Sequence, residues 1–406
     1  MKRLLRGLGC LCFLFHAVVV ACQDGDPDGG TGGTGVSYLP SDSLQPGEFV
    51  RVALESPVAA SYEWSVAVAP AGASYELSPD GVRALFRPRA PGDYRLRAVP
   101  AVEGSGLAEQ TAAVRVAEPA CEPLGGTLIG IAGSSPNRFV HVDPCTGVQT
   151  PLADVGDPSM GFPQGIYAVD PDARRLYLQR STGGELHLLG LDADTGAVTM
   201  DVVVPPPALT MIEVDPGAGG LLVVTGDVDA RLKHVDPGSG TLDDAGSVGS
   251  MAGVLQGIYA VDPGRHRLYF LRGVEGDNVH LVAVDTRTAA PVVDVALSVP
   301  HVGALRFDAV GGVLFGVTGC CPNEFAAIDP ATGEVEPRAI LGDSTVGFPQ
   351  GINGVASEDH AFIFERSEIG GSGASLVVVD TRTGSQRSSV PRSGGSFMVL
   401  EYVPAP

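Results

Sequence analysis

Long amphipathic stretches with the helical period are lacking in this chain of 406 residues, which has a single tryptophan and only 6% aromatic residues. Glycine (55) and proline (32) are abundant instead. Short runs in which apolar and polar residues alternate, such as FVRVALE and YRLRAV, recur between Gly, Pro, Asp and Ser. This pattern is typical of β-strands joined by turns, and 44% apolar residues suffice for cores. The sequence therefore predicts an all-β protein.

Clusters of lysine and arginine are also lacking beyond the first six residues, and the formal net charge is −21. Binding to nucleic acid or to anionic lipid needs clustered cations. The composition therefore argues against a nucleic-acid partner. We interpret the excess of acidic residues as a feature of the protein surface that favours solubility.

Catalytic signatures are missing as well. No G-x-S-x-G nucleophile motif, P-loop, H-x-H or H-E-x-x-H motif occurs. The histidines His141 and His234, and likewise His187 and His280, occupy equivalent positions in a repeat that is described below. We interpret them as inherited strand residues and expect no metal.

The N-terminus reads MKRLLRGLGCLCFLFHAVVVACQD, a basic start followed by an apolar run that is short for a membrane span. Val19-Val20-Ala21-Cys22 resembles a bacterial lipobox, which implies a signal peptide over 1–21 and a lipid on Cys22. An ordinary signal peptide is the alternative. Residues 22–35 are rich in Gly and Asp and are expected to be a flexible tether. In bacterial lipoproteins, Asp after the lipidated cysteine signals retention at the inner membrane. This chain has Gln23 at that position, so the resemblance implies an outer-membrane lipoprotein, periplasmic or surface-exposed.

Residues 36–118 contain five or six short alternating strands. Trp64 lies in YEWSV, and a tight Pro91-Gly92 turn precedes the strand DYRLRAV. This order resembles the immunoglobulin-like and PKD-like sandwiches of surface proteins. We expect Trp64 in the core and a spacer role for this domain.

Residues 121–406 repeat a hairpin signature, D-x-x-[T/S]-[G/A], after an apolar strand. Asp at the start of such a turn accepts backbone N–H groups, and Gly supplies the positive φ. The signature recurs at intervals of 49, 44, 49, 44 and 51 residues, which predicts a repeat of four-stranded units. Its first residues are Asp143, Asp192, Asp236, Asp285, Asp329 and Asp380.

A second motif marks every other unit. It reads GFPQGIYAVD at 161–170, VLQGIYAVD at 254–262 and GFPQGINGV at 347–355. The domain is therefore three copies of a double unit, and six sheets of four strands predict a six-bladed β-propeller. The first unit lacks a first strand, which the C-terminal segment 396–403 is expected to supply, closing the ring.

The segment RLYFLRGVEGDNVHLVAVDTRTAAPVVDV at 267–295 resembles the YVTN-type repeats of bacterial extracytoplasmic propellers. Those repeats share their strand pattern with NHL and quinoprotein propellers. The resemblance implies the fold and no particular substrate. The tryptophan motif of quinone-binding propellers is missing, so no cofactor is expected.

Four cysteines are expected to form disulfides, because an exported protein meets an oxidising compartment. In a four-stranded blade the first-to-second and third-to-fourth turns share one rim. Cys121 and Cys145 lie in those two turns of the first blade and are predicted to pair. Cys320 and Cys321 are adjacent and are predicted to form a vicinal disulfide, with two reduced thiols as the alternative.

The rim that carries the QG motifs is the predicted binding face. Arginine ends the second strand of each even unit, and its fork of donors suits carboxylates or sugar acids. The alternative is that each arginine bonds carbonyl groups of its own blade. The candidate residues are Arg180, Arg272, Arg366, Gln164, Gln256 and Gln350, with Phe162 and Phe348 as walls of the channel mouth.

Two functional hypotheses follow. The first is a monomeric, non-catalytic lipoprotein whose propeller binds an envelope protein, a glycan or a small anionic ligand. The second is a propeller enzyme, a lyase or hydrolase acting at the channel mouth. Acids and bases that converge in the channel would favour the enzyme, and an apolar channel would favour the binding protein. The missing catalytic motifs favour the first hypothesis.

We predict that Cys22 is the first residue of the mature chain and carries lipid. Intact-mass measurement of the protein from the membrane fraction tests this prediction, because the lipid adds the mass of its acyl chains to a chain starting at Cys22. A chain that starts at Gln23 or elsewhere and has no added mass would contradict it.

Overall fold

The computed structural model describes most of the chain from residue 36 onward. The regular secondary structure of its described parts is β-strand, apart from one short 3₁₀ turn at Pro216–Ala218. None of the helices in this described portion has the length and apolar character to cross a membrane. The described residues are 36–39, 44–54, 57, 59, 61–101, 108–117, 121–133, 136–156, 165–226, 228–250, 254–273, 279–319, 322–342, 346–348, 351–368 and 373–406.

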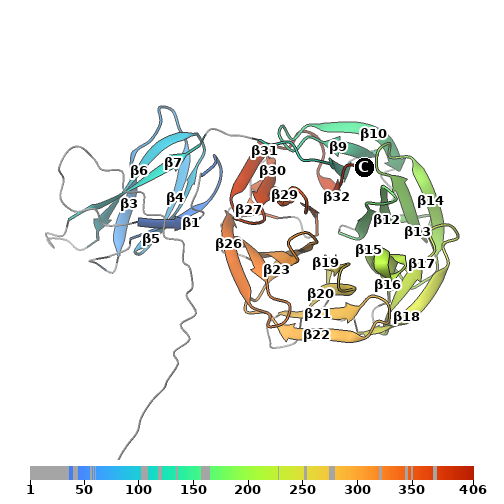
Figure 1. Cartoon of the computed structure of the whole chain (residues 1–406). Helices are drawn as coiled ribbons and strands as arrows, with labels where there is room; N and C mark the ends of the chain where they lie inside the picture. The colour runs from blue at the N-terminus through green and yellow to red at the C-terminus, as the bar shows by residue number, and fades with distance from the viewer. Residues whose placement is uncertain are drawn as a thin grey trace, which may run out of the picture.

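The N-terminal strands form two sheets (Figure 1). Trp64 on β3 is 8% exposed and packs in a core with Phe86, Tyr94 and Leu96, which confirms its predicted place. One sheet has the order β1 (Val36–Leu39), β2 (Val50–Leu54), β5 (Arg83–Pro88), β4 (Tyr75–Asp80), and the other β3 (Tyr62–Val68), β6 (Gly92–Pro100), β7 (Gln110–Val116).

The remaining strands form a β-propeller, in which sheets surround a common centre (Figure 1). The first of these sheets has the order β10 (Gln149–Gly156), β9 (Asn137–Val142), β8 (Thr127–Ala132), β32 (Phe397–Val403). The next two are β11 (Tyr167–Asp170), β12 (Arg175–Thr182), β13 (Glu185–Asp192), β14 (Val198–Val204), and β15 (Leu209–Asp215), β16 (Gly220–Thr225), β17 (Ala230–Val235), β18 (Leu242–Gly249).

The other three sheets continue around the ring, each beginning with its innermost strand. They are β19 (Val254–Asp262), β20 (Arg267–Gly273), β21 (Val279–Asp285), β22 (Pro291–Ala296); β23 (Val302–Asp308), β24 (Val313–Thr318), β25 (Asn323–Ile328), β26 (Val335–Gly342); and β27 (Val346–Gly347) with β28 (Asn353–Ala356), β29 (Ala361–Glu368), β30 (Ala374–Asp380), β31 (Gln386–Pro391).

The C-terminal strand closes the ring. β32 pairs antiparallel with β8, from Phe397 opposite Ala132 to Val403 opposite Thr127. The pairing joins the two ends of the propeller and covers the edge of β8, as the sequence predicts.

The six Asp turns have the predicted geometry. In the first, the side chain of Asp143 accepts the backbone N–H of Cys145 at 2.8 Å, and Gly147 has φ +68°. Ala289 holds the glycine position of the fourth turn and still adopts φ +56°. The local motif therefore imposes the turn even on a residue that disfavours this conformation.

A disulfide joins Cys121 and Cys145, whose Cα atoms are 5.3 Å apart. This confirms the predicted pairing and ties the segment before β8 to the turn that follows β9. The cysteines at positions 22, 320 and 321 lie outside the described residues.

The N-terminal sheets contact the propeller through the β1–β2 segment. Phe49 is 1% exposed, forms an isolated antiparallel bridge with Ile340 on β26, and has the guanidinium groups of Arg87 and Arg366 over its ring. Glu48 accepts the backbone N–H of Gln386 at 3.1 Å, and burial raises the pKa of its carboxyl to about 8. The two parts are thus held by an apolar contact surrounded by charged groups.

We predict that Cys145→Ser lowers the free energy of unfolding of the propeller by about 3 kcal/mol, because a disulfide spanning 24 residues restricts the unfolded chain. Denaturant unfolding of oxidised protein gives the value. Cys121→Ser should cost the same, and the double variant should cost no more than either single one. Additive losses would show that the thiols act by packing and not as a bond.

Candidate functional site

The QG motif that marks every second unit lies at the centre of the ring. Gly165, Gly257 and Gly351 have φ of +73°, +74° and +68°, and their backbones meet. A Cβ added to Gly165 would lie 2.6 Å from the Cα of Gly257, and one on Gly351 would lie 2.4 Å from the carbonyl oxygen of Gly257. Only glycine permits this approach, which narrows one end of the channel to contact between backbones.

Two buried tyrosines from the same motif reach across this centre. The hydroxyl of Tyr259 lies 2.8 Å from the carbonyl oxygen of Gly165. The hydroxyl of Tyr167 lies 2.9 Å from the carbonyl oxygen of Gly351 and 3.0 Å from the carbonyl oxygen of Leu400. The third copy of the motif has Asn353 in place of a tyrosine, so one third of this layer lacks a large ring.

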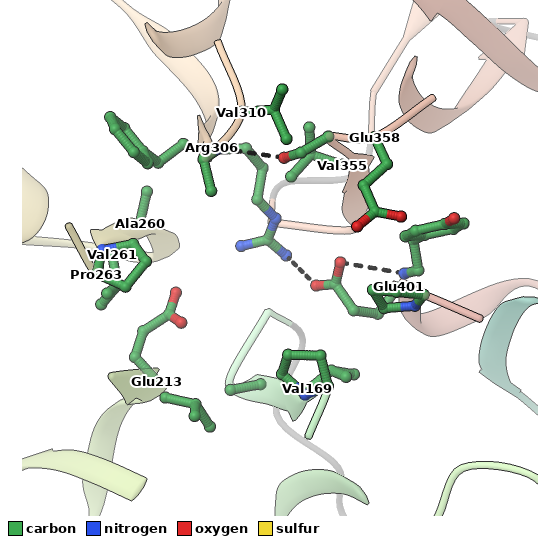
Figure 2. Close-up of a pocket in the computed structure, with 18 of the residues that line it drawn as sticks. Val169, Glu213, Ala260, Val261, Pro263, Arg306, Val310, Val355, Glu358 and Glu401 are labelled. Carbon is green, nitrogen blue, oxygen red and sulfur yellow. Dashed lines mark hydrogen bonds and ion pairs between the residues drawn. The ribbon is translucent and has the colours of Figure 1, made fainter. Parts of the chain in front are cut away.

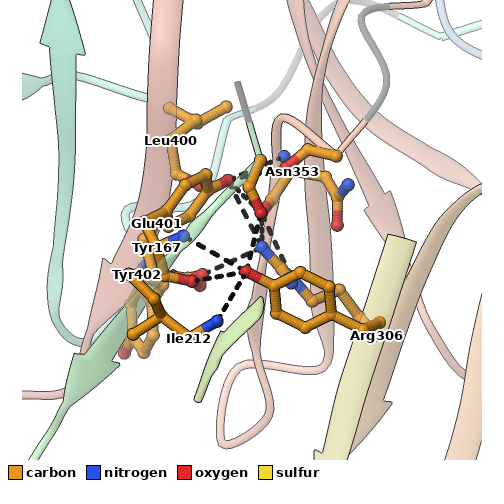
Figure 3. Close-up of polar contacts among 10 residues, drawn as sticks. Tyr167, Ile212, Arg306, Asn353, Leu400, Glu401 and Tyr402 are labelled. Atoms are coloured by element: carbon orange, nitrogen blue, oxygen red, sulfur yellow. Dashed lines mark hydrogen bonds and ion pairs between the residues drawn. The ribbon is translucent and has the colours of Figure 1, made fainter. Parts of the chain in front are cut away.

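Arg306 on β23 takes up the space beside Asn353 (Figure 3). Its Nη2 donates to the carbonyl oxygen of Asn353 at 2.8 Å and to Oε2 of Glu401 at 3.1 Å, and it lies 3.3 Å from the hydroxyl of Tyr167. Nε also donates to the carbonyl of Asn353, at 3.2 Å. The residue is only 7% exposed, so the guanidinium is fixed in the interior by protein acceptors.

Three ionisable residues lie at equivalent positions of the repeat, and we call them the charged column. The sequence analysis missed them. Glu213 on β15, Arg306 on β23 and Glu401 on β32 all lie two residues before the end of an innermost strand. Aligning LTMIEVD, VGALRFD and FMVLEYV would have placed them in one column. Their side chains face the same space at the centre of the ring (Figure 2).

This column borders a cavity of about 320 Å³. The cavity is walled by apolar side chains and opens at the turns that follow the innermost strands, on the opposite side from the three glycines. Its lining includes Val169, Val214, Val261, Val310, Val355, Pro171, Pro263, Pro404, Tyr402 and Glu358. The cavity therefore has charged side chains in its interior and apolar side chains along its wall.

Burial controls the charge of this interior. Because protein surrounds Glu213, burial raises the pKa of its carboxyl to about 8, although the charge of Arg306 opposes this shift. Burial also raises the pKa of Glu401, against the attraction of Arg306. Burial is the largest single influence and would lower the pKa of Arg306, but the neighbouring acidic groups, Glu401 foremost, together outweigh it, so the pKa is raised. Acid and base side chains therefore converge in the channel, the arrangement expected of an enzyme.

Two of the predicted arginines are paired within their own sheets. Arg180 contacts Asp201 at 2.8 Å, and Arg272 contacts Asp294 at 2.6 Å. His187 and His280 bind the second oxygen of the same carboxylates, at 2.6 Å and 2.8 Å. Each trio lies across three neighbouring strands of one sheet.

The third arginine serves another contact. Ser389 replaces the aspartate in this sheet, and Arg366, 2% exposed, donates to its hydroxyl at 3.1 Å. Arg366 also donates to the carbonyl oxygens of Leu341 and of Gly47 in the N-terminal part, at 3.1 Å and 3.3 Å. The three guanidinium groups therefore do not converge on one point.

The other predicted residues of this face are only partly visible. Phe348 packs against Phe364, with ring centroids 5.4 Å apart, and against the cluster of Phe49 and Ile340. Phe162, Gln164 and Gln350 lie outside the described residues, as does the side chain of Gln256. A binding role for this set stays a prediction.

The histidines do not form a metal centre in the described parts of the chain. No group of three or more His, Cys, Asp or Glu side chains there could hold a metal ion. His141 lies within 3.4 Å of the carbonyl oxygen of Ala193 in the neighbouring sheet, a packing contact between sheets.

Neither protein-family models nor curated proteins match this chain. Among solved structures, the chain is similar to TolB from Acinetobacter baumannii, with a TM-score of 0.53 and 12% identity over 78% of this chain and 80% of that chain. A quinonprotein alcohol dehydrogenase-like protein from Bacteroides thetaiotaomicron gives a TM-score of 0.44, with 12% identity over 88% and 96% of the two chains. The likeness to TolB supports the β-propeller fold and shows nothing of activity.

We predict that Gly351→Ala destabilises the propeller by more than about 2 kcal/mol. A left-handed alanine costs roughly 1–2 kcal/mol, and the added methyl group would also collide with the backbone of Gly257. Gly183→Ala is the matched control, because Gly183 has φ +61° and open space around it. Denaturant unfolding compares the two, and equal losses would refute the axial contact.

Proposed function

We propose that the protein is a lipid-anchored binding protein of the bacterial cell envelope, in which the channel of a six-bladed propeller holds a small ligand. The observation that carries the proposal is the cavity that the charged column borders. Within the described part of the chain, Nη1 of Arg306 has no hydrogen-bond acceptor and Glu213 has no ion-pair partner, and both border the cavity. A ligand would supply the missing partners.

The arrangement of strands supports the two-domain division at about residue 120. The six sheets between Thr127 and Val403 serve as six blades. The N-terminal sheet orders correspond to the A-B-E-D and C-F-G sheets of an immunoglobulin-like sandwich. The hydroxyl of Tyr94, at the start of β6, donates to the carbonyl oxygen of Ala90 at 2.8 Å, as in the tyrosine corner of that fold. This domain would act as the spacer between tether and propeller.

The energetics of the channel support a binding role. Placing ions in a protein interior costs more free energy than apolar side chains would, unless pairing and hydrogen bonds offset the lost hydration. Arg306 and Glu401 offset each other, whereas Glu213 has no ion-pair partner among the described residues and avoids this cost at neutral pH by holding a proton. An acid kept in such a place is favoured when a ligand interacts with it.

The cell-envelope location is supported by the sequence and by one bond. The lipobox-like segment ending at Cys22 implies export and anchoring through lipid. The disulfide between Cys121 and Cys145 fits an oxidising compartment. Outer-membrane attachment rests on the resemblance at Gln23 alone.

An enzyme is the second candidate, and the two carboxyl groups of the cavity favour it. Glu213, with a pKa near 8, would hold a proton at neutral pH and could act as a general acid, while Glu401 is engaged by Arg306. The described residues that line the cavity include no histidine or cysteine, and their one serine, Ser357, accepts the backbone N–H of Ala309. Binding is therefore preferred over turnover.

We predict that at least one class of small ligand binds saturably in the channel and that Val261→Trp, which fills the cavity, abolishes this binding. Ligand-observed NMR on the mature chain, with a panel of carboxylates, sugars and amines, measures it. Val203→Trp on the outer strand β14 is the control, because Val203 is 55% exposed and far from the cavity.

The same samples separate the two candidates. A ligand that binds and stays chemically unchanged over days supports the binding protein, whereas one that is converted supports the enzyme. Binding that persists in Val261→Trp, or no saturable binding across the panel, would contradict the proposal.

A further inference from the structure

We infer that the channel binds an α-ammonium group that lies next to a carbonyl or carboxylate group, as in a free amino acid or the N-terminus of a peptide. Glu213 would hold the ammonium group and Nη1 of Arg306 would donate to the neighbouring oxygen. This inference rests on the proposed binding function and names the chemistry of its ligand.

The first argument is charge. Three carboxyl groups, Glu213, Glu358 and Glu401, line the cavity together with one guanidinium, Arg306. Glu401 offsets that guanidinium at 3.1 Å, so a simple anion would enter a space with an excess of acid. A ligand that brings a positive charge can pair with Glu213 when this carboxyl group gives up its proton, because Glu213 has no ion-pair partner among the described residues.

The second argument is the pair of groups that the fold leaves facing the cavity. Arg306 is more than nine-tenths buried, and its Nε and Nη2 are used by Asn353, Tyr167 and Glu401. Its Nη1 points into the space toward which Glu213 also points (Figure 2). A donor and a carboxyl side by side match a ligand that has an acceptor and an ammonium group on adjacent carbons.

The third argument is the shape and polarity of the remainder. Beyond the charged interior the wall is formed by Val169, Val261 and Val355 and by prolines near the mouth. A cavity of about 320 Å³ is at the small end of ligand sites. An aliphatic side chain would fill this wall, while the open mouth would let a peptide chain continue into solvent.

Protonation of Glu213 gives the inference a characteristic signature. Its raised pKa means that the empty site holds a proton at neutral pH, and an ammonium ligand requires the ionised carboxylate. Binding should therefore release close to one proton. The affinity should rise by about tenfold per pH unit below this pKa, and above it the affinity should fall again as the α-amino group of the ligand loses its own proton, which for a peptide N-terminus happens at about pH 8. Glu358 and Glu401 face the same cavity, and Arg306 is the cation that opposes them.

The experiment uses the mature chain, three matched probes (L-leucine, L-leucinamide and N-acetyl-L-leucinamide) and the tripeptide Leu-Gly-Gly. Isothermal titration calorimetry in two buffers of different ionisation enthalpy gives affinity and proton release together. The first two probes should bind at least tenfold more tightly than the acetylated one, which has no positive charge. Preference for leucine indicates a free amino acid, and tight binding of Leu-Gly-Gly indicates a peptide N-terminus.

Glu213→Gln should weaken the ammonium probes at least tenfold and abolish proton release, because the amide has no charge. Glu334→Gln, at an exposed turn, should change neither. Equal binding of the acetylated probe, or an unchanged Glu213→Gln, would overturn the inference. If sugars or carboxylates bind and Val261→Trp blocks them, the proposed function survives and only this ligand class is wrong.

Discussion

The contact of three glycine backbones at the centre of the ring is the constraint on which the rest of the propeller depends. Gly165, Gly257 and Gly351 bring three innermost strands to contact distance at one end. The hydroxyls of Tyr167 and Tyr259 then bond carbonyl groups of neighbouring copies, which fixes the strands relative to one another. Since the strands cannot separate at this end, the central cavity that the described residues line lies toward the opposite rim.

At two of the places where the threefold repeat is broken, an arginine makes contacts that its counterparts in the other copies do not make. Asn353 stands where the other copies have tyrosine, and Arg306 occupies the freed space. Ser389 stands where the other copies have aspartate, and Arg366 also donates to the carbonyl oxygen of Gly47 in the N-terminal part of the chain. Departures from a local rule often mark functional sites, and here each departure gives an arginine a second use.

The sequence was sufficient for the repeat architecture and insufficient for the site. The Asp turns and the closing strand depend on local motifs, so their spacing predicted the sheets and the pairing of β32 with β8. The charged column could not be recognised as easily, because each strand contributes one charged residue and no short motif surrounds it. The sequence also did not indicate which end of the channel holds the cavity, because the other end is narrowed by three glycines that are distant in sequence. Arg180 and Arg272 were predicted as binding residues because they recur in the repeat. Each is instead paired with an aspartate on the outer strand of its own sheet.

Ring closure by β32 also sets an order of events during synthesis. β8 is made long before its partner β32, so the first sheet keeps an open edge until β32 has emerged. Glu401 belongs to β32 and also lines the cavity. The cavity can therefore be completed only after β32 has been made, and a product that terminates before β32 would lack both the pairing with β8 and one of the three charged groups.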